Sequence, residues 1–320
     1  MLIYLLKRLI MTILVLLFVV VFLAVLVHIV PGDPAKTILG PRASPEHIAR
    51  VRAEMDLDEP VRIQVGRFLQ KAIRGDLGTD VFTRRSMNDI IADVFFHTAV
   101  LAVSGLGLAI IIGIPMGLYS ATHPDSLIDR ITALISISLI NIPTYVAGLL
   151  LLTVFAIRLR ILPGGGVTNP DSPDSIPQYL KYLILPAITL AATWIGYIAR
   201  LVRTSLLEVL NENYIRAAKS EGLKERVVNY KYALKNAMIP TFAVLGMGLG
   251  RLLGGAVFVE IVFNRPGMGR LIFDSIALRN FPLVRACVLV VTFLVVAINF
   301  LVDIGYAMLD PRIKLDKAGN

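Results

Sequence analysis

Two charged side chains inside a long apolar stretch are the residues whose setting most needs a chemical explanation. Arg251 lies about halfway along Ile239–Phe263, and Glu260 lies nearer its end. An arginine at the centre of a bilayer costs about 2.5 kcal/mol or more unless it faces water, a counter-charge or a bound solute. Asn141, in another apolar stretch, is tolerated only against protein or water. We predict that these three side chains line a passage for a solute, although a structural ion pair between Arg251 and Asp303 is the alternative.

The groups that bond-making chemistry requires are missing from the sequence. No glycine cluster has the GxxxxGK[ST] spacing that cradles ATP phosphates, and neither HExxH nor GxSxG occurs. The four histidines are scattered, so we expect no metal site. The single cysteine, Cys287, excludes an internal disulfide. The sequence therefore predicts no enzyme, and no cofactor held by this chain.

A polar island, Tyr214–Pro240, separates two apolar stretches and is too charged to lie in lipid. Its first part is expected to form a short helix that Gly222 ends, as a C-terminal glycine does. Two adjacent alanines in this helix would let another protein approach the backbone closely. We predict a docking surface for a partner, made of Tyr214, Arg216, Ala217, Ala218, Lys219, Ser220, Glu221, Gly222 and Leu223.

A second amphipathic helix is expected after Gly222, because apolar residues recur there every three or four positions. These residues are Leu223, Val227, Tyr230, Leu234 and Met238. Pro240 would then begin the next membrane helix, where its missing N–H costs nothing. A short helix on such a stiff base could pass force from a partner to the membrane. The alternative is an ordinary amphipathic loop.

The composition is that of an integral membrane protein, since 56% of the 320 residues are hydrophobic and the mean hydropathy is +0.73. All membrane spans should be helices, because backbone groups in lipid must bond within their own segment. Lys7 and Arg8 before the first span place both termini in the cytoplasm if the number of spans is even. The net charge of +9 is spread over loops, so we expect no nucleic-acid binding. Six stretches qualify as spans: Leu9–Val30, Thr98–Thr122, Ile131–Ile157, Leu183–Ala199, Ile239–Phe263 and Ala286–Leu309.

Successive segments of the chain are expected to lie on different sides of the membrane or within it. Residues 1–30 form the cytoplasmic N-terminus and first span, and residues 31–96 form an extracytoplasmic cap with helices at Glu46–Met55 and Val61–Ile73. Residues 97–309 form a five-helix core that contains the cytoplasmic loop 201–240, and residues 310–320 form a cytoplasmic tail. About sixty residues bury little core alone, so the cap should lie on the membrane part.

Small residues mark where helices should pack closely. Gly246, Gly250 and Gly254 form two overlapping GxxxG steps in the fifth span, a smooth face for a neighbouring helix. Gly113 and Gly117 have the same spacing in the second span. The outer connector Arg158–Lys181 is expected to be irregular, and Pro143 should kink the third span.

The polar island resembles the EAA loop of ABC importer permeases, a pattern that begins E-A-A, continues to a glycine and ends in a proline. Ala217, Ala218, Gly222 and Pro240 match residues of this pattern, while Arg216 stands where the general pattern has Glu. That departure is similar to the dipeptide and oligopeptide subfamily. The segments Phe263–Gly269 (FNRPGMG) and Leu309–Ile313 (LDPRI) are similar to the same subfamily, so the resemblance covers nearly the whole chain.

The resemblance implies a permease of the type I ABC importer kind, an all-α protein with six membrane helices in a bacterial or archaeal inner membrane. It implies a paralogous permease subunit, two ATP-binding subunits that hold ATP and Mg, and an extracytoplasmic solute-binding protein. The implied cargo is a di- or oligopeptide; glutathione, nickel chelates and opine-like solutes are alternatives. An ion-coupled secondary transporter or channel is the alternative from another class, although no internal repeat supports it.

Overall fold

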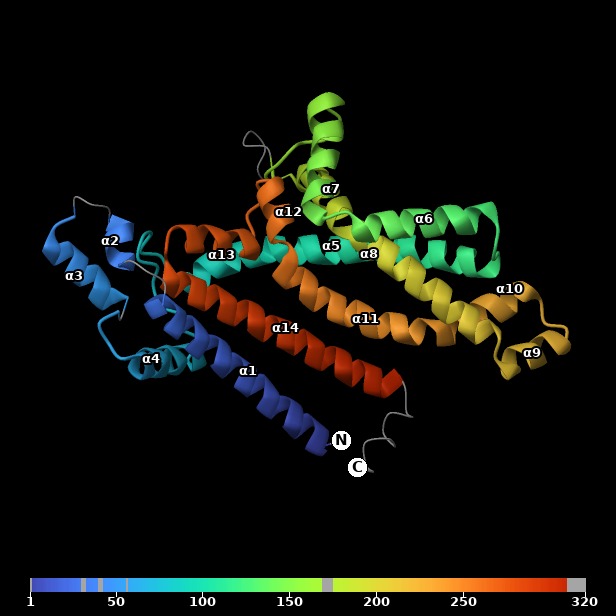
Figure 1. Ribbon diagram of the computed structural model, residues 1–320, viewed down its shortest axis with the longest axis horizontal. Coiled ribbons are helices and arrows are strands. Elements are labelled where there is room, and N and C mark those ends of the chain that lie inside the picture. Colours follow the sequence, from blue (N-terminus) through green and yellow to red (C-terminus); the bar gives the residue numbers. More distant parts are fainter. Residues whose placement is uncertain (1, 30–32, 40–42, 56, 169–174, 310–320) are drawn as a thin grey trace. The chain divides into compact units, whose positions relative to one another are not determined.

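Every regular element in the part of the chain that the structure describes is a helix. The structure is a computed structural model that describes residues 2–29, 33–39, 43–55, 57–168 and 175–309 (Figure 1). Within these ranges the only strand-like pairing is an isolated bridge between Thr79 and Ser86. The expected all-α class is therefore confirmed.

The chain forms two compact units. The first consists of Met1–Thr98, Leu253–Val257 and Pro266–Ala297. The second consists of Ala99–Leu252, Phe258–Arg265 and Ile298–Asn320. The cap thus belongs to the same unit as the first helix and the beginning of the last one.

The first unit packs the cap on the first helix, as predicted. The cap helices are α2 (Pro34–Leu39), α3 (Pro45–Glu54) and α4 (Val61–Ile73), and they follow α1 (Leu2–Ile29). Helix α4 buries Val65 and Phe68 against Val20 and Ala24 of α1. Both predicted cap helices are confirmed to within a residue at each end.

Helix α2 was not predicted from the sequence. The Asp33 side chain accepts a hydrogen bond from the Ala35 amide at 3.1 Å, as an N-cap does, and Pro34 occupies the first helical position. The Asp-Pro pair was therefore a helix-start signal.

A short helix that the sequence analysis did not predict, α13 (Met268–Ala277), completes the first unit. The Met268 amide donates to Thr98 Oγ1 at 2.8 Å, and Asn280 donates from its side chain to Asp80. Met268 and Leu283 pack in one cluster with Met87 at the start of α5 (Met87–Thr122). The last helix, α14 (Phe281–Leu309), follows α13 after a tight turn.

The second unit contains closely packed helices. Its first elements along the chain are the remainder of α5, α6 (Leu127–Asn141), α7 (Thr144–Leu151), the π-helical segment η1 (Leu152–Arg158) and α8 (Ile176–Leu210). A Cβ atom on Gly117 would lie 2.5 Å from the Ala199 carbonyl oxygen of α8, and one on Gly113 would lie 3.0 Å from Ile198. The predicted close packing at these two glycines is therefore confirmed.

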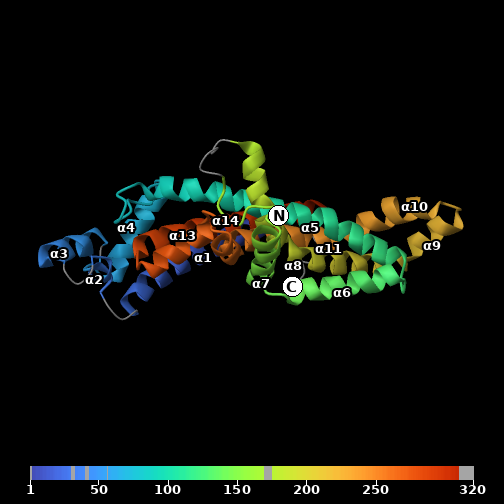
Figure 2. The same cartoon turned by 90° about the horizontal axis from the view of Figure 1, so that it is seen from above.

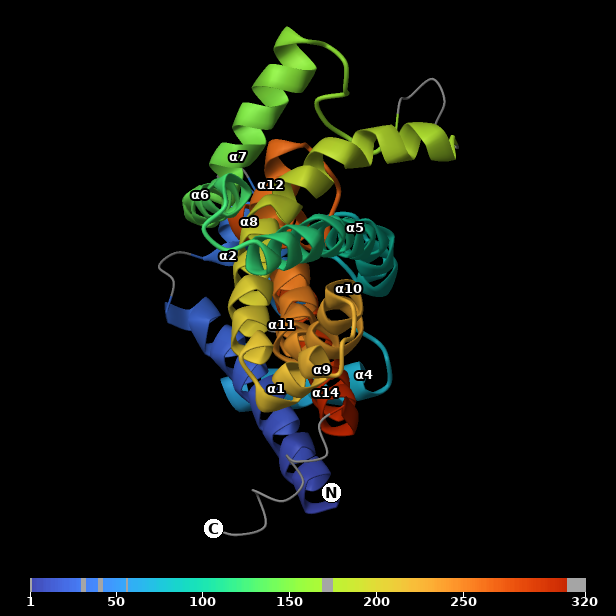
Figure 3. The ribbon, with the colours of Figure 1, turned by 90° about the vertical axis from the view of Figure 1, so that its right-hand side faces the viewer.

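The third predicted span is not one helix, because α6 and α7–η1 meet at a bend of 105° (Figure 3). Ile142 adopts an extended conformation, to which a following proline restricts its neighbour, and Pro143 supplies no N–H to continue the helix. The kink predicted at Pro143 is confirmed, and it divides the predicted span Ile131–Ile157 into two helices.

The fifth predicted span is also interrupted. Helix α11 (Leu234–Gly255) ends before Ala256, and α12 (Val257–Val262) follows it. Pro240 lies inside α11 rather than at its first position, so the prediction for Pro240 is wrong. The fourth span is longer than predicted, since α8 runs from Ile176 to Leu210 through part of the expected outer connector.

Three described helices are long and apolar enough to cross a membrane, and a fourth is added if the bent α6–α7 pair is one span. Helix α1 contributes a shorter apolar stretch over Ile10–Leu26, and α11 carries Lys235 and Arg251. The total of six spans remains a prediction.

Candidate functional site

The polar island folds into a compact group of short helices at the end of α8 (Figure 1). We call this group, residues 213–240, the foot. Helix α9 (Asn213–Ser220) follows α8 after a two-residue turn. Next come α10 (Glu225–Val227), the π-helical segment η2 (Val228–Ala233) and α11. One buried cluster joins the foot to the ends of α5 and α8, and its buried members are Leu118, Ala121, Leu206, Ile215, Ala218, Val228, Ala233 and Ala237.

Helix α9 has one buried face and one exposed face. Ile215 is fully buried and Ala218 is 7% exposed, both within the cluster. The prediction that both alanines face a partner is therefore wrong for Ala218, which contacts the chain's own core. The exposed face carries Tyr214, Arg216, Ala217, Lys219 and Ser220, and it continues over Glu221 and Gly222 to the half-buried Leu223.

The end of α9 is a Schellman motif. The Gly222 amide donates to the Lys219 carbonyl at 3.0 Å, and the Leu223 amide donates to the Ala218 carbonyl at 3.3 Å. Gly222 has a φ of +78°, so its role in ending the helix is confirmed. A Cβ atom on Gly222 would have no neighbour within 4 Å, which leaves this position open to a partner.

Side-chain hydrogen bonds hold the foot in one shape. Arg216 Nη2 donates to the Asn211 carbonyl at 3.0 Å, and Ser220 Oγ donates to the Arg216 carbonyl at 3.0 Å. The Asn236 amide donates to the Tyr214 hydroxyl at 2.8 Å and ties α9 to α11. Tyr214, Arg216 and Ser220 thus serve the foot itself, and Ala217, Lys219, Glu221 and Gly222 present its outer surface.

The π-helical segment changes which side chains of the second amphipathic helix are buried. Val227 and Tyr230 of the predicted apolar stripe are 37% and 57% exposed. Val228 and Ala233 are fully buried instead. A π turn inserts one extra residue, so the spacing of three and four fails across this segment. Beyond the segment the stripe faces the core again, because Leu234 packs against the cluster and Met238 is buried.

An ion pair directly above the foot connects three helices, and the sequence analysis did not predict it. Arg203 of α8 donates from Nε to Asp129 Oδ1 at 2.7 Å and from Nη2 to Asp129 Oδ2 at 2.9 Å. Ser120 of α5 donates to the same carboxylate, which belongs to the first turn of α6. The Arg203 guanidinium holds the pKa of the Asp129 carboxyl well below its usual range. Figure 2 shows α5 and α6 running side by side toward the foot.

A sequence signal for this ion-pair clamp (Ser120, Asp129 and Arg203) was present. Ser126 caps α6, and its hydroxyl accepts a hydrogen bond from the Asp129 amide at 3.1 Å. A Ser followed three residues later by an acidic residue before an apolar run indicates a helix start. The partner, Arg203, is 74 residues away, and nothing in the sequence pairs it with Asp129.

The three predicted passage residues lie in different settings. Asn141 is exposed and donates to the Ile137 carbonyl of its own helix at 2.7 Å. Arg251 is exposed on α11, and among the described residues it forms no ion pair. Its alternative partner, the Asp303 side chain, lies outside the described residues. Among the described residues, no hydrogen bond or ion pair joins Asn141 or Arg251 to each other or to Glu260.

Glu260 does not line an open surface, so its predicted role is corrected. Its side chain is fully buried on α12, close to the equally buried Arg265, whose Nη2 donates to the Tyr179 hydroxyl at 2.6 Å. Burial lowers the pKa of Arg265, and the negative charge of Glu260 acts against that shift. The connector between η1 and α8 joins this group, because the Gly166 amide donates to the Phe263 carbonyl at 2.8 Å.

The glycines of α11 approach two different helices. A Cβ atom on Gly246 would overlap Val302 of α14 at 2.2 Å, and one on Gly248 would overlap the Trp194 ring of α8 at 2.6 Å. Gly250 is buried, and the surroundings of Gly254 lie outside the described residues. Gly246 therefore packs against α14. Gly248, which the sequence analysis did not predict as a packing position, packs against α8.

The geometry of the foot suits the transmission of movement along the helices that leave it. No group of three His, Cys, Asp or Glu side chains within the described ranges is placed to hold a metal ion. The foot is rigid, hydrogen-bonded and exposed on one face, and it continues directly into α8 and α11. A force applied to α9 would therefore move both of these helices.

Comparisons with known proteins cover nearly the whole chain. A family model described as "Binding-protein-dependent transport system inner membrane component" matches residues 113–315, and the corresponding N-terminal model matches residues 1–101. A Salmonella paratyphi A protein, "Glutathione transport system permease protein GsiC", is 38% identical and covers 97% of this chain and 98% of its own length. "Dipeptide transport system permease protein DppB" of Alkalihalophilus pseudofirmus is 37% identical and covers 98% and 100%.

A solved structure has a similar fold. It is an inward-facing conformation of the MetNI methionine ABC transporter, with a TM-score of 0.57 at 17% identity. The likeness covers 69% of this chain and 96% of the matched chain. At this identity the likeness shows the fold alone.

Proposed function

Because the chain belongs to the family of binding-protein-dependent transport system inner membrane components, we propose that it is one of two permease subunits of an ATP-driven peptide importer. It spans the inner membrane, receives cargo from an extracytoplasmic binding protein and releases it into the cytoplasm. The observation that carries this proposal is the exposed face of α9, held rigidly by its own buried cluster and hydrogen bonds.

Di- or oligopeptides are the proposed cargo. The two relatives named above are a glutathione permease and a dipeptide permease, and glutathione is itself a peptide derivative. Glutathione is therefore the first alternative cargo, before nickel chelates or opine-like solutes. The extracytoplasmic binding protein would make most of the selection.

The proposed mechanism uses α9 as a lever. ATP, with Mg, binds between two separate ATP-binding subunits and draws them together. A groove on one of these subunits holds the exposed face of α9 and moves it. The buried cluster and the clamp transmit the movement to α5, α6 and α8, and the passage changes sides. Such switching requires two alternative packings of the helices, not contacts with the cargo.

The proposal also includes a second permease subunit and the orientation of the chain in the membrane. A second, paralogous permease supplies the other half of the passage. Both termini lie in the cytoplasm, and the cap faces the binding protein. Asn141 and Arg251, both exposed on this chain, are proposed to face the passage or the second permease.

Purification tests the proposal at its first step. The full chain, produced with its neighbouring transport genes, is expected to purify as a stable complex with an ATP-binding subunit, because α9 presents a preformed docking face. Mass spectrometry of the purified complex identifies its subunits. Solute transport in vesicles by this chain alone would contradict the proposal and favour an ion-coupled transporter.

Arg251 provides a test of the passage. The change Arg251→Gln is expected to reduce uptake of anionic peptides relative to neutral ones by about tenfold, which is the effect of about 1.4 kcal/mol lost from a charge-assisted contact. The ratio of the two uptake rates in reconstituted vesicles is the measurement. Met247→Gln, one turn earlier on the same face, is the control and should leave the ratio unchanged. An equal loss for both cargoes would indicate a structural role for Arg251.

A further inference from the structure

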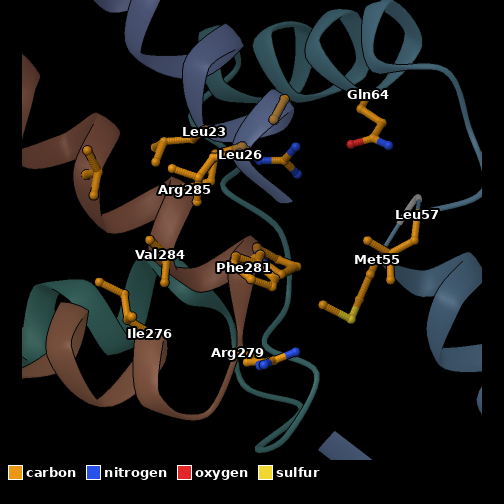
Figure 4. A pocket seen from close by; sticks show the side chains of 13 residues that line it. Leu23, Leu26, Met55, Leu57, Gln64, Ile276, Arg279, Phe281, Val284 and Arg285 are labelled. Carbon is orange, nitrogen blue, oxygen red and sulfur yellow. The ribbon is translucent and has the colours of Figure 1, made fainter. Parts of the chain in front are cut away.

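Two features of the structure have no part in the mechanism above. The first is a mostly apolar pocket of about 290 Å³ in the first unit, lined by side chains of α1, the cap, α13 and α14 (Figure 4). Its two arginines, Arg279 and Arg285, each take part in another interaction, so neither offers a free charge to a ligand. The second is the π-helical segment η2, which lies between α10 and α11 in the foot. Short π-helical turns are rare and frequently occur at functional sites.

The segment η2 holds one residue more than an α-helix would. The Leu234 amide donates to the Asn229 carbonyl, five residues back, where an α-helix uses a carbonyl four residues back. Val228 is fully buried in the cluster that joins the foot to α5 and α8. Val227 and Tyr230 are exposed, although their spacing would place them on the same face of an α-helix as Leu234, which packs against that cluster. The extra residue thus decides which apolar side chains are buried.

Two adjacent valines give the segment a second way to pack. If η2 became α-helical and passed its extra residue to the turn before α10, the residues ahead of it would rotate by about 100°. Val227 and Tyr230 would then lie on the face of Leu234, toward the cluster. Val228 would face outward. One valine is buried in either packing, so the exchange costs little apolar burial.

The turn before α10 can take up one residue. Lys224, the N-cap of α10, forms no side-chain capping bond, so the start of this helix is not fixed by a cap. An added Cβ at Gly222 has no neighbour within 4 Å, so the turn has space around it. The side-chain hydrogen bonds described for the foot involve no residue of 224–230. One of them ties Tyr214, at the other end of α9, to Asn236 of α11, so the Gly222 end of α9 is the end that can move.

We propose that η2 is a register switch, which gives the foot two packings, and that the ATP-binding subunit selects between them. In the packing seen here Val228 is buried, and Val227 and Tyr230 are exposed. In the other packing η2 is α-helical, Val228 is exposed, and one added residue in the turn releases the Gly222 end of α9. A partner shifts such an equilibrium only if it binds one packing better. Val227 and Tyr230 supply this difference, because they are available for contact in one packing only.

Cysteine labelling tests the switch in the purified complex, and the proposal rests on the proposed function because an ATP-binding subunit must be present. The single native cysteine, Cys287, is buried. Without nucleotide the Val228→Cys variant should react slowly with N-ethylmaleimide. With a non-hydrolysable ATP analogue its labelling rate is expected to rise about tenfold, because the rate follows the population in which the side chain is exposed. An equally slow rate in both conditions would overturn the proposal.

Two variants are the controls for labelling. Ala233→Cys replaces a buried residue on the side of η2 that keeps its register, so it should remain protected in both conditions. Ile73→Cys, at an 86% exposed position of the cap, should react equally fast in both conditions. An ATP-dependent rise for Ala233→Cys as large as that for Val228→Cys would indicate general loosening of the foot and would overturn the switch.

Deletion of Asn229 tests the switch without a probe. It places Val228 four residues before Ala233, so an α-helix can keep Val228 buried and no extra residue remains to be moved. The ATP-binding subunit should still copurify, since α9 is unchanged. Uptake per ATP hydrolysed is expected to fall by about tenfold, as for the loss of a population shift of that size. Asn229→Ala keeps the chain length and should retain uptake.

The results separate this proposal from the importer itself. If no ATP-binding subunit copurified with the unmodified chain, the proposed function would fail, and the switch would fail with it. If the subunit copurified and hydrolysed ATP, but labelling of Val228→Cys did not change or the deletion variant took up cargo at the normal rate, the switch alone would be overturned.

Discussion

Replacing Gly222 by tryptophan is expected to abolish uptake and cargo-stimulated ATP hydrolysis in the assembled importer while its membrane helices remain folded. The position is exposed, and nothing in this chain lies within 4 Å of an added Cβ. A large side chain would therefore project into the ATP-binding partner. Overpacking a close interface costs about 1–3 kcal/mol, which is up to about a hundredfold in docking affinity. The measurements are the amount of ATP-binding subunit that copurifies and the rate of ATP hydrolysis with and without loaded binding protein.

Two variants separate docking from backbone strain. Gly75→Trp is matched, because Gly75 has a φ of +79° against +78° for Gly222 and an equally empty environment. It carries the same backbone penalty of about 1–2 kcal/mol but lies in the cap, so it should retain the ATP-binding subunit. Gly222→Asn should retain most activity, since asparagine tolerates left-handed backbone and is small. If the Gly222→Trp variant took up cargo as fast as the unmodified protein, the proposed docking role of α9 would be contradicted.

Arg203→Met is expected to lower the free energy of unfolding by about 3 kcal/mol and to uncouple ATP hydrolysis from uptake. The change leaves the Asp129 carboxylate, whose side chain is only 7% exposed, without its cation. Asp129→Asn should cost less, about 1–2 kcal/mol, because the amide keeps hydrogen bonds to Ser120 and Arg203 is one-third exposed to water. Equilibrium unfolding of the purified complex in detergent measures both free energies of unfolding.

Arg200→Met is the control for the clamp. Arg200 lies one turn earlier on α8 and is exposed, so its loss should change the free energy of unfolding by no more than about 0.5 kcal/mol. If Arg203→Met behaved like Arg200→Met, the clamp would have no part in holding α5, α6 and α8 together.

The clamp also predicts a dependence of stability on acid. The folded-state pKa of Asp129 lies below its unfolded value, so the unfolded chain binds a proton first as the pH falls. The stabilisation is complete above the unfolded pKa and is lost progressively as the pH falls toward the folded value. Asp129→Asn should remove this part of the acid dependence, and an unchanged acid profile would show that the ion pair contributes nothing.

Local signals predicted the parts of the structure that depend on neighbours in the sequence. The cap helices over 46–55 and 61–73, the glycine that ends α9, the close packing at Gly113 and Gly117 and the break at Pro143 all follow from caps, backbone preferences or spacing. The angle of that break and the interruption after Gly255 did not follow, because they depend on what each helix packs against.

The amino-acid sequence by itself determined that this is an all-helical membrane protein, and it singled out the polar island that we propose as a docking surface. Only the tertiary structure decided which face of that surface is free. Ala218 and Val228 turned inward because a π turn and the ends of α5 and α8 close over them. The same folding brought Arg203 to Asp129 and buried Glu260 beside Arg265. A charged side chain takes its role from the partner that packing brings to it, and that partner can lie anywhere along the chain.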